Sequence, residues 1–215
     1  MITVVEEEDA SAVDQAVSAL RAGKLVALPC DTVYSLSCDA TSPEAVKRVF
    51  EVKRRPRDKP VSVAVHSPEA ALKLLKPVPG LKRALETLTP GPVTIVAPAR
   101  SGVVAEQVTA GRDTLGVRIP DHPFFLRVVR RFGRPVVTTS ANVSGEPAPV
   151  DANGVIEQLG DDLDLLVEGE CPIKEPSTVI ELKPDGEIEI LREGALSREE
   201  ILEALEGVVP GVGKG

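Results

Sequence analysis

The chain has 215 residues, of which 42% are hydrophobic and 27% are charged, and its formal net charge is −8. These values are usual for a globular protein and exclude a disordered chain and a membrane protein, and the length favours one domain. Three cysteines without a CxxC pair and two histidines argue against a disulfide scaffold and a structural zinc site.

The N-terminus turns acidic at Glu6-Glu7-Glu8, where a signal peptide would carry basic and then apolar residues, so a cytoplasmic protein is expected. The acidic balance and the 2% content of aromatic residues argue against a general nucleic-acid binder, which would need a basic surface and stacking side chains.

Helix-like and strand-like segments alternate along the chain, which predicts an α/β fold. Helix starts are marked by capping residues, as in Ser42-Pro43-Glu44 and in the capping box that begins at Ser197. In chain order, helices are expected to begin near residues 9–11, 42, 67, 121, 154 and 197, with strands at 25–28, 61–65, 92–97, 115–119, 136–139, 163–167, 178–182 and 188–191. The last residues, 208–215, are rich in Gly and Pro and are expected to form a flexible tail after a domain at 1–207.

A basic run, Lys53 to Lys59, places five cations in seven positions of this acidic chain. Lys53 and Arg54 could simply complement the C-terminal end of the preceding helix, and the run could be a solvated loop. Pro56 must nevertheless end the helix, so the cations straddle a helix-to-strand loop, a common place for ligand sites. The run therefore has a structural interpretation and an anion-binding one.

Polar clusters also follow several of the predicted strands, at residues 29–34, 118–120 and 139–142. In open α/β sheets such strand ends line a crevice for ligands. The sequence contains no GxGxxG, Walker A, GxSxG or HExxH motif, so the common nucleotide-binding, hydrolase and metalloprotease devices are not indicated.

Six segments occur in the order expected of one family. They are Pro29 to Leu36 (PCDTVYSL), Lys53 to Pro56 (KRRP), Val117 to Pro120 (VRIP), Ser140 to Gly145 (SANVSG), Ser177 to Ile180 (STVI) and Leu191 to Gly194 (LREG). Over about residues 24–205 the chain resembles YrdC/TsaC-type threonylcarbamoyl-AMP synthases in their short, single-domain form.

The resemblance implies a YrdC-like twisted mixed sheet with flanking helices and a cationic central crevice. It also implies an enzyme that condenses L-threonine, bicarbonate and ATP into threonylcarbamoyl-AMP and pyrophosphate, for the threonylcarbamoyladenosine modification of tRNA. Mg²⁺ is expected to accompany ATP, since phosphoryl and nucleotidyl transfers depend on positioning and charge stabilisation, and no protein ligand for a metal is predicted. Proteins that use the product are possible transient partners.

The same resemblance implies two sets of contact residues. The residues expected at threonine are Thr32, Arg118, Thr138 and Ser177. The residues expected at the nucleotide are Lys53, Arg55, Lys59, Thr114, Ser140, Asn142 and Arg192, with Lys53 and Arg55 as the catalytic cations.

Structural interpretations compete with these roles. Thr32 and Ser140 could satisfy backbone groups of turns, and Arg118, in an apolar strand, could form a buried ion pair. Asn142 could be a loop residue that tolerates left-handed geometry, and Arg192 could be a surface charge.

Two other functions also remain open. The basic run could bind RNA in a ribosome-assembly module, with a steep dependence on salt. The chain could also be a carbamoyl-transfer domain of the kind found in hydrogenase-maturation proteins, although it lacks the zinc-finger and acylphosphatase segments that accompany such a domain.

The sequence departs from the family pattern at Cys30, Ser35, Ser37, Ala64 and Ala148. Ser35 and Ser37 replace frequent glycines after Tyr34, and because serine adopts positive φ less freely than glycine, they are expected to limit how closely that loop approaches a ligand. Ala148 stands where many relatives place a serine near ATP, and Ala64 where some longer relatives place a histidine near threonine.

Overall fold

The computed structural model describes residues 2–207, in which ten strands form one sheet and helices connect them. The strands are β1 (Thr3–Glu6), β2 (Val26–Leu28), β3 (Ser35–Ser37), β4 (Ser62–Ala64), β5 (Val93–Pro98), β6 (Thr114–Arg118), β7 (Val136–Ser140), β8 (Leu165–Glu168), β9 (Thr178–Leu182) and β10 (Ile188–Arg192). The helices are α1 (Ala12–Arg21), α2 (Pro43–Val52), α3 (Pro68–Leu72), α4 (Leu81–Leu88), α5 (Glu106–Thr109), α6 (Pro123–Phe132), α7 (Ala152–Leu159), the 3-10 turn Gly160–Asp162 and α8 (Arg198–Leu205). The tail predicted at 208–215 lies outside the described residues.

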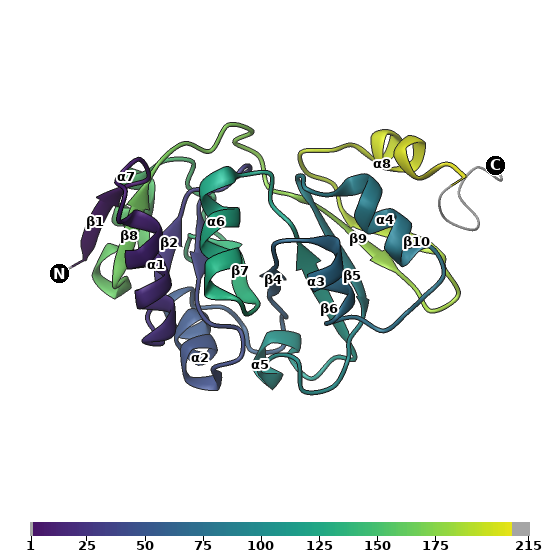
Figure 1. Cartoon of the computed structure of the whole chain (residues 1–215), viewed down its shortest axis with the longest axis horizontal. Helices are drawn as coiled ribbons and strands as arrows, with labels where there is room; N and C mark the ends of the chain where they lie inside the picture. Colours follow the sequence, from purple (N-terminus) through teal and green to yellow (C-terminus); the bar gives the residue numbers. More distant parts are fainter. Residues whose placement is uncertain (1, 208–215) are drawn as a thin grey trace.

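The sheet is mixed and runs along the whole molecule in the order β1-β8-β2-β3-β7-β4-β6-β5-β9-β10 (Figure 1). Strand β7 joins its two halves. Its C-terminal residues pair with β3 through Ser35↔Ser140, and its N-terminal residues pair with β4 through Val63↔Val137. Several neighbours, such as β4 and β6, are parallel, whereas β5 and β6 are antiparallel. The predicted α/β fold with a mixed sheet and flanking helices is confirmed.

Alternation along the strands separates two cores on opposite faces of the sheet. Val136 and Ala64 belong to the core that α1 and α6 cover, and these two helices lie side by side (Figure 1). Val137 and Val63, one position away, belong to the larger core that contains residues of α2, α4, α7 and α8. Because the sheet is long and α1 and α6 cover only part of it, a stretch of the same face stays available for a pocket.

Capping residues set the predicted helix starts at residues 42, 67 and 197, whereas Ser11 forms no side-chain cap hydrogen bond at α1. The side chain of Ser42 accepts a hydrogen bond from the Ala45 N–H at 3.2 Å, and Ser67 caps α3 in the same way. At α8 the predicted capping box is complete, because Ser197 and Glu200 exchange side-chain and backbone hydrogen bonds. These short polar contacts explain why helix starts could be placed from the sequence.

The structure adds elements that the sequence patterns above do not predict, namely β1, β3, α4 and α5. Strand β1 is mostly exposed and pairs only with β8 at the end of the sheet. Strand β3 is polar but buried, and Ser35 Oγ shares hydrogen bonds with Ser37 Oγ (3.1 Å) and with Thr138 Oγ1 (3.0 Å). Hydroxyl pairs here replace the apolar contacts that usually reveal a buried strand.

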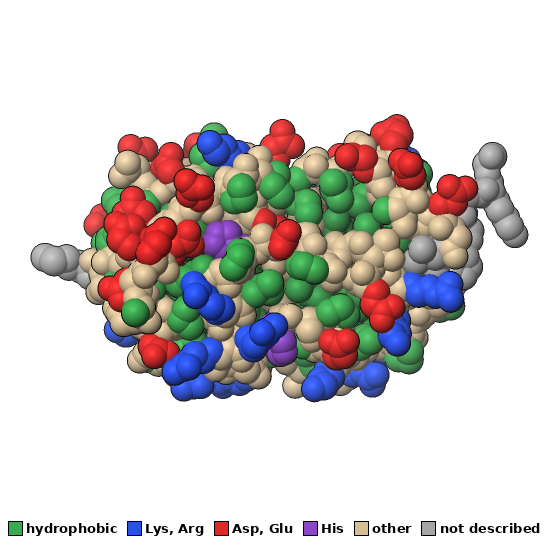
Figure 2. Space-filling view, turned by 45° about the horizontal axis from the view of Figure 1, so that its top comes forward, with side chains coloured by type: hydrophobic (Ala, Val, Ile, Leu, Met, Phe, Trp, Pro, Cys, Tyr) green, Lys and Arg blue, Asp and Glu red, His purple; other side chains and the backbone are tan. Residues whose placement is uncertain are grey.

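Charge is unevenly distributed over the surface. On the face in Figure 2, acidic side chains gather toward the end that carries the N-terminus, whereas Lys and Arg lie mostly along the lower edge. The net charge of −8 is therefore compatible with local groups of cations. Among residues 2–207, no helix has both the length and the apolar character needed to cross a membrane.

Gly194 makes the closest backbone approach near the pocket. A Cβ at this position would lie 2.2 Å from the Pro176 carbonyl oxygen and 2.8 Å from the Ser177 carbonyl carbon and oxygen. We expect Gly194→Ala to lower the free energy of unfolding by about 2–3 kcal/mol in urea denaturation, because backbone must shift. The matched control is Gly160→Ala. Gly160 has a φ of −54°, and a Cβ built there would have the side chain of Ile156 as its nearest neighbour. Equal stability of Gly194→Ala and the wild type would contradict this account.

Candidate active site

A pocket of about 340 Å³ opens on the sheet between β7 and β10, a volume usual for small-molecule sites. Eight of the eleven predicted site residues line it. These eight are Thr32, Arg55, Thr114, Arg118, Thr138, Ser140, Ser177 and Arg192. The structure therefore brings together side chains from both predicted sets, the threonine set and the nucleotide set.

Strand alternation explains the floor of the pocket. On β6, Thr114, Gly116 and Arg118 line the pocket, whereas Leu115 and Val117 point into the larger core. The neighbouring strands β5 and β9 follow the same alternation. The pocket thus lies on the face that α1 and α6 cover elsewhere, and strand residues form a rigid floor for it.

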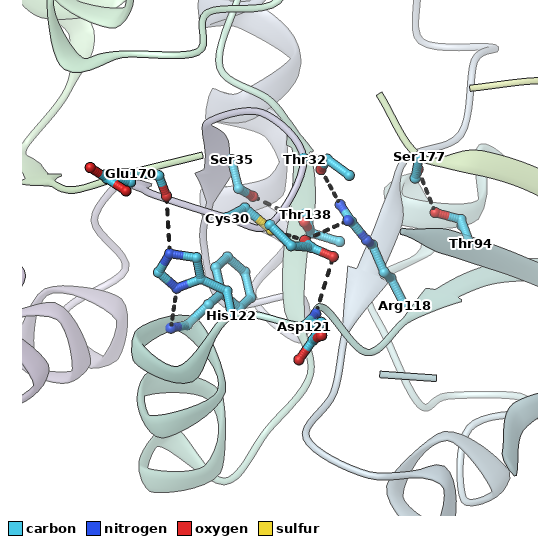
Figure 3. A network of polar contacts seen from close by, with 12 residues as sticks. Cys30, Thr32, Ser35, Thr94, Arg118, Asp121, His122, Thr138, Glu170 and Ser177 are labelled. Carbon is cyan, nitrogen blue, oxygen red and sulfur yellow. Dashed lines mark hydrogen bonds and ion pairs between the residues drawn. The ribbon is translucent and has the colours of Figure 1, made fainter. Parts of the chain in front are cut away.

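Arg118 is the most constrained of the lining cations, with 6% of its surface exposed. One terminal nitrogen donates to Asp31 Oδ1 at 2.6 Å and the other donates to Thr32 Oγ1 at 2.8 Å (Figure 3). Its Nε is buried and has no hydrogen-bond partner among the residues that the structure describes. The buried ion pair considered from the sequence is therefore present, but it uses only part of the guanidinium.

Hydroxyl groups surround Arg118 on two sides. Thr138 Oγ1 and Ser35 Oγ lie 3.0 Å apart, and Thr94 Oγ1 and Ser177 Oγ also lie 3.0 Å apart. In Figure 3 the side chain of Arg118 lies between Thr32 and the Thr94–Ser177 pair. Because a hydroxyl can both donate and accept, these groups can adapt to a ligand with an ammonium, a carboxylate and a hydroxyl.

Two further arginines are fixed at the pocket by backbone carbonyls. Arg55 donates to the carbonyls of Lys59 (3.1 Å) and Pro60 (2.7 Å), and Arg192 donates to the carbonyl of Ser177 (2.7 Å). Partial burial of the guanidinium lowers the pKa of Arg55 and of Arg192, although Arg192 as a whole is an exposed residue, and the neighbouring cations Arg192 and Arg118 respectively add to the effect. Arg192, one candidate for a plain surface charge, is thus anchored at the pocket.

Lys53, Lys59 and Asn142 are not among the lining residues. Lys53 is 1% exposed, and its Nζ donates to the Asn142 carbonyl at 2.8 Å, to Asn142 Oδ1 at 3.1 Å and to the Ser140 carbonyl. Burial, together with Arg55, lowers the pKa of Lys53 to about 7, while the three oxygens favour the charged form. Lys53 therefore holds the end of β7, at Ser140, and the start of the loop that follows it.

Asn142 and Lys59 also take part in hydrogen bonds with neighbouring residues of their own loops. The Asn142 amide nitrogen donates to the carbonyls of Val143 and Glu146 at 2.9 and 2.7 Å. The Lys59 side chain is exposed, and its carbonyl accepts from Arg55. In this structure the two residues organise loops beside the pocket, and direct contact with a nucleotide remains a prediction for both.

Several lining residues are absent from the sequence-based sets, notably Arg112, Glu181, Ser62 and Thr94. Alternation was the available signal, because Glu181 lies two positions from Val179 on one face of β9 and Thr94 pairs with Arg118 across β5 and β6. Arg112 lies in a loop, where no periodicity could have placed it. Glu181 is the single carboxylate among the described lining residues.

The departures from the family pattern occupy ordered positions. Cys30 donates its Sγ–H to Asp31 Oδ1 at 3.1 Å, and burial raises the pKa of the thiol. Ser35 and Ser37 belong to β3 and have no positive φ, so the structure shows no backbone strain there. Ala64 is buried in the core under α6 and does not line the pocket.

Comparisons with known proteins agree with this arrangement. The family model Sua5/YciO/YrdC, described as "Telomere recombination", matches residues 18–194. A threonylcarbamoyl-AMP synthase of Pyrococcus abyssi is 40% identical over 184 residues, which cover 85% of this chain and 54% of the relative. One of Vibrio campbellii is 33% identical over 185 residues, which cover 84% of this chain and 98% of the relative. The chain therefore spans about half of the archaeal relative and nearly all of the Vibrio one.

Among solved structures, that of Pyrococcus abyssi Sua5 in complex with L-threonine superposes with a TM-score of 0.88 at 36% sequence identity, over 95% of this chain and 61% of that one. Escherichia coli YciO, at 21% identity and a TM-score of 0.83, shares the fold. Since the family model covers most of the chain and the pocket contains residues of all six family-like segments, the protein belongs to the Sua5/YciO/YrdC family.

Proposed function

We propose that this protein synthesises threonylcarbamoyl-AMP from L-threonine, bicarbonate and ATP, with release of pyrophosphate, for the modification of tRNA. The observation that carries the proposal is the arrangement around Arg118, a buried guanidinium whose Nε has no partner among the described residues, at a hydroxyl-lined pocket where further arginines converge. Relatives named threonylcarbamoyl-AMP synthase and a relative crystallised with L-threonine support it.

L-Threonine fits the part of the pocket around Arg118. The remaining N–H groups of Arg118 would bind its carboxylate, which a planar guanidinium does with paired, charge-assisted hydrogen bonds. The hydroxyls of Thr32, Thr138 and Ser177 would bind its other polar groups.

ATP fits the part of the pocket that Arg55, Arg192, Thr114 and Ser140 line. The amine of threonine would add to the carbon of bicarbonate with loss of water, and a carbamate oxygen would then attack the α-phosphorus. The bond between the α-phosphorus and the bridging oxygen breaks, and pyrophosphate leaves. The arginines would offset the charge on the phosphoryl oxygens and the leaving group, so no protein nucleophile is required.

The donor set of the pocket fits a magnesium ion that arrives on ATP. Mg²⁺ is usually held by one or two carboxylates together with substrate phosphates. Glu181 is the carboxylate that could reach it, and no group of three or more metal-binding side chains occurs within residues 2–207. When bound, the ion would neutralise phosphate charge.

The test is pyrophosphate release from ATP. We expect release that requires L-threonine and bicarbonate together and that does not require tRNA. Release that is independent of threonine, or no release from folded protein, would contradict the proposal. If the exposed cations Arg54, Arg57 and Lys59 instead served RNA, the protein would bind RNA with a steep salt dependence.

A further inference from the structure

The carboxylate of Asp31 contacts a pocket residue, Arg118, although Asp31 itself does not line the pocket. Its side chain lies next to Arg118 with 1% of the residue exposed. Oδ1 accepts from Arg118 at 2.6 Å and from Cys30 Sγ at 3.1 Å, while Oδ2 accepts from the backbone N–H of Asp121 at 3.1 Å. Its chain neighbour Cys30 and two donors from the end of β6 and the residues just after it, Arg118 and Asp121, therefore fix this one carboxylate.

These contacts determine the orientation of Arg118. Asp31 binds one terminal nitrogen and Thr32 Oγ1 accepts from the other, so the guanidinium plane is held at two points. The Nε remains without a partner among the described residues. Because Thr32 Oγ1 already accepts from Arg118, its own hydrogen is free to be donated to a ligand.

We propose that Asp31 is a positioning residue for the amino-acid end of the pocket: it orients Arg118 and frees the Thr32 hydroxyl hydrogen for a bound carboxylate. This inference rests on the proposed function, since it takes L-threonine as the ligand. Asp31 also compensates the charge of Arg118 in the empty site, so the arginine can stay buried before the ligand arrives.

The backbone of Asp31 forms a hydrogen bond with a second loop, which leads to the pocket. Its carbonyl accepts from the Ile173 N–H at 2.9 Å, and Pro176 and Ser177, a few residues further on, line the pocket. Because a side-chain substitution at Asp31 keeps this backbone contact, we expect it to affect the threonine end and to leave the arginines of the nucleotide end in place.

The test compares Asp31→Asn with Asp39→Asn. Asp39 is a matched control because it is also buried (5% exposed) and pairs with an arginine at 2.9 Å, but that arginine, Arg134, does not line the pocket as Arg118 does. Calorimetric titration of L-threonine should give a dissociation constant about tenfold higher for Asp31→Asn than for the wild type. We expect wild-type threonine affinity for Asp39→Asn and wild-type ATP affinity for both variants.

A second readout follows Arg118 itself. In ¹⁵N spectra of the wild type without ligand, the Nε–H of Arg118 should give a resolved resonance that exchanges slowly with water, because the group is buried and held. Asp31→Asn should broaden or shift that resonance, whereas Asp39→Asn should not. If Asp31→Asn does not fold, Asp31→Glu, which keeps the charge but moves the carboxylate, should show the same effects to a smaller degree.

The outcomes distinguish a failure of the positioning role of Asp31 from a failure of the proposed function. Weaker threonine binding together with a changed Arg118 resonance in the Asp31 variants supports the positioning role. Unchanged threonine affinity, or an unchanged Arg118 resonance in a folded Asp31 variant, overturns it. A wild type that does not bind threonine contradicts the proposed function instead, and the resonance still decides whether Asp31 orients Arg118.

Discussion

Replacement of Arg118 by lysine is expected to raise the L-threonine concentration needed for half-maximal pyrophosphate release by about 10- to 100-fold, because one or two charge-assisted hydrogen bonds are lost. Lysine keeps a positive charge near Asp31, so the buried carboxylate retains a partner. It cannot reproduce the planar fork or replace the Nε–H, a buried donor that has no partner among residues 2–207. The requirement for ATP should change by less than about threefold, since Arg55 and Arg192 keep their own backbone anchors.

The measurement is steady-state pyrophosphate release with each substrate varied in turn. Arg131→Lys is the matched control, because Arg131 forms an exposed ion pair with Asp14 at 2.7 Å and does not line the pocket. This variant should behave like the wild type, since exposed ion pairs contribute little. Equal effects of Arg118→Lys on the threonine and ATP requirements would contradict the assignment of Arg118 to the threonine carboxylate.

The sequence allowed the pocket to be anticipated because its residues follow predictable strands. The polar clusters at 118–120 and 139–142 follow the predicted strands β6 and β7, so strand ends point to a shared crevice. Thr114 and Thr138 were expected only from the family resemblance, and the structure shows that they line the same pocket as Arg118 and Ser140. The capping signals at Ser42 and Ser197 depend on contacts within one turn of chain. Local physical chemistry was therefore sufficient for the strand ends and these helix starts.

Other features depend on partners far away in the sequence. Lys53 stood in an obviously basic run, yet its Nζ points to the loop at 140–142, a partner that no local pattern reveals. Asp31 accepts from Arg118, 87 positions away, and only the assembled sheet brings the two together. The polar strand β3 escaped prediction for the same reason, because Thr138 satisfies its hydroxyls from another strand.

Replacement of Lys53 by methionine is expected to weaken ATP binding by about tenfold or more and to lower the free energy of unfolding by about 3 kcal/mol. Methionine fills much of the same volume but removes the donor that the carbonyl oxygens of Ser140 and Asn142 share, and it leaves the Asn142 side-chain oxygen with the Ser140 hydroxyl as its donor. Buried acceptors without a donor are costly, so the loop should shift and carry Ser140 away from the nucleotide. Threonine binding, measured without ATP, should change little.

Calorimetric titration of ATP and urea denaturation together decide how Lys53 acts. Lys47→Met is the matched control, since Lys47 lies on α2, the helix that Lys53 caps, is exposed and pairs only with Glu51 at 3.7 Å among the described residues. A loss of both stability and ATP affinity in Lys53→Met alone would mean that Lys53 supports the site through the loop. Loss of ATP affinity at full stability would mean instead that Nζ leaves its three oxygens and binds phosphate directly, as the family-like segment predicts. Since the ammonium has three N–H donors and the loop supplies three acceptors, we expect the first result.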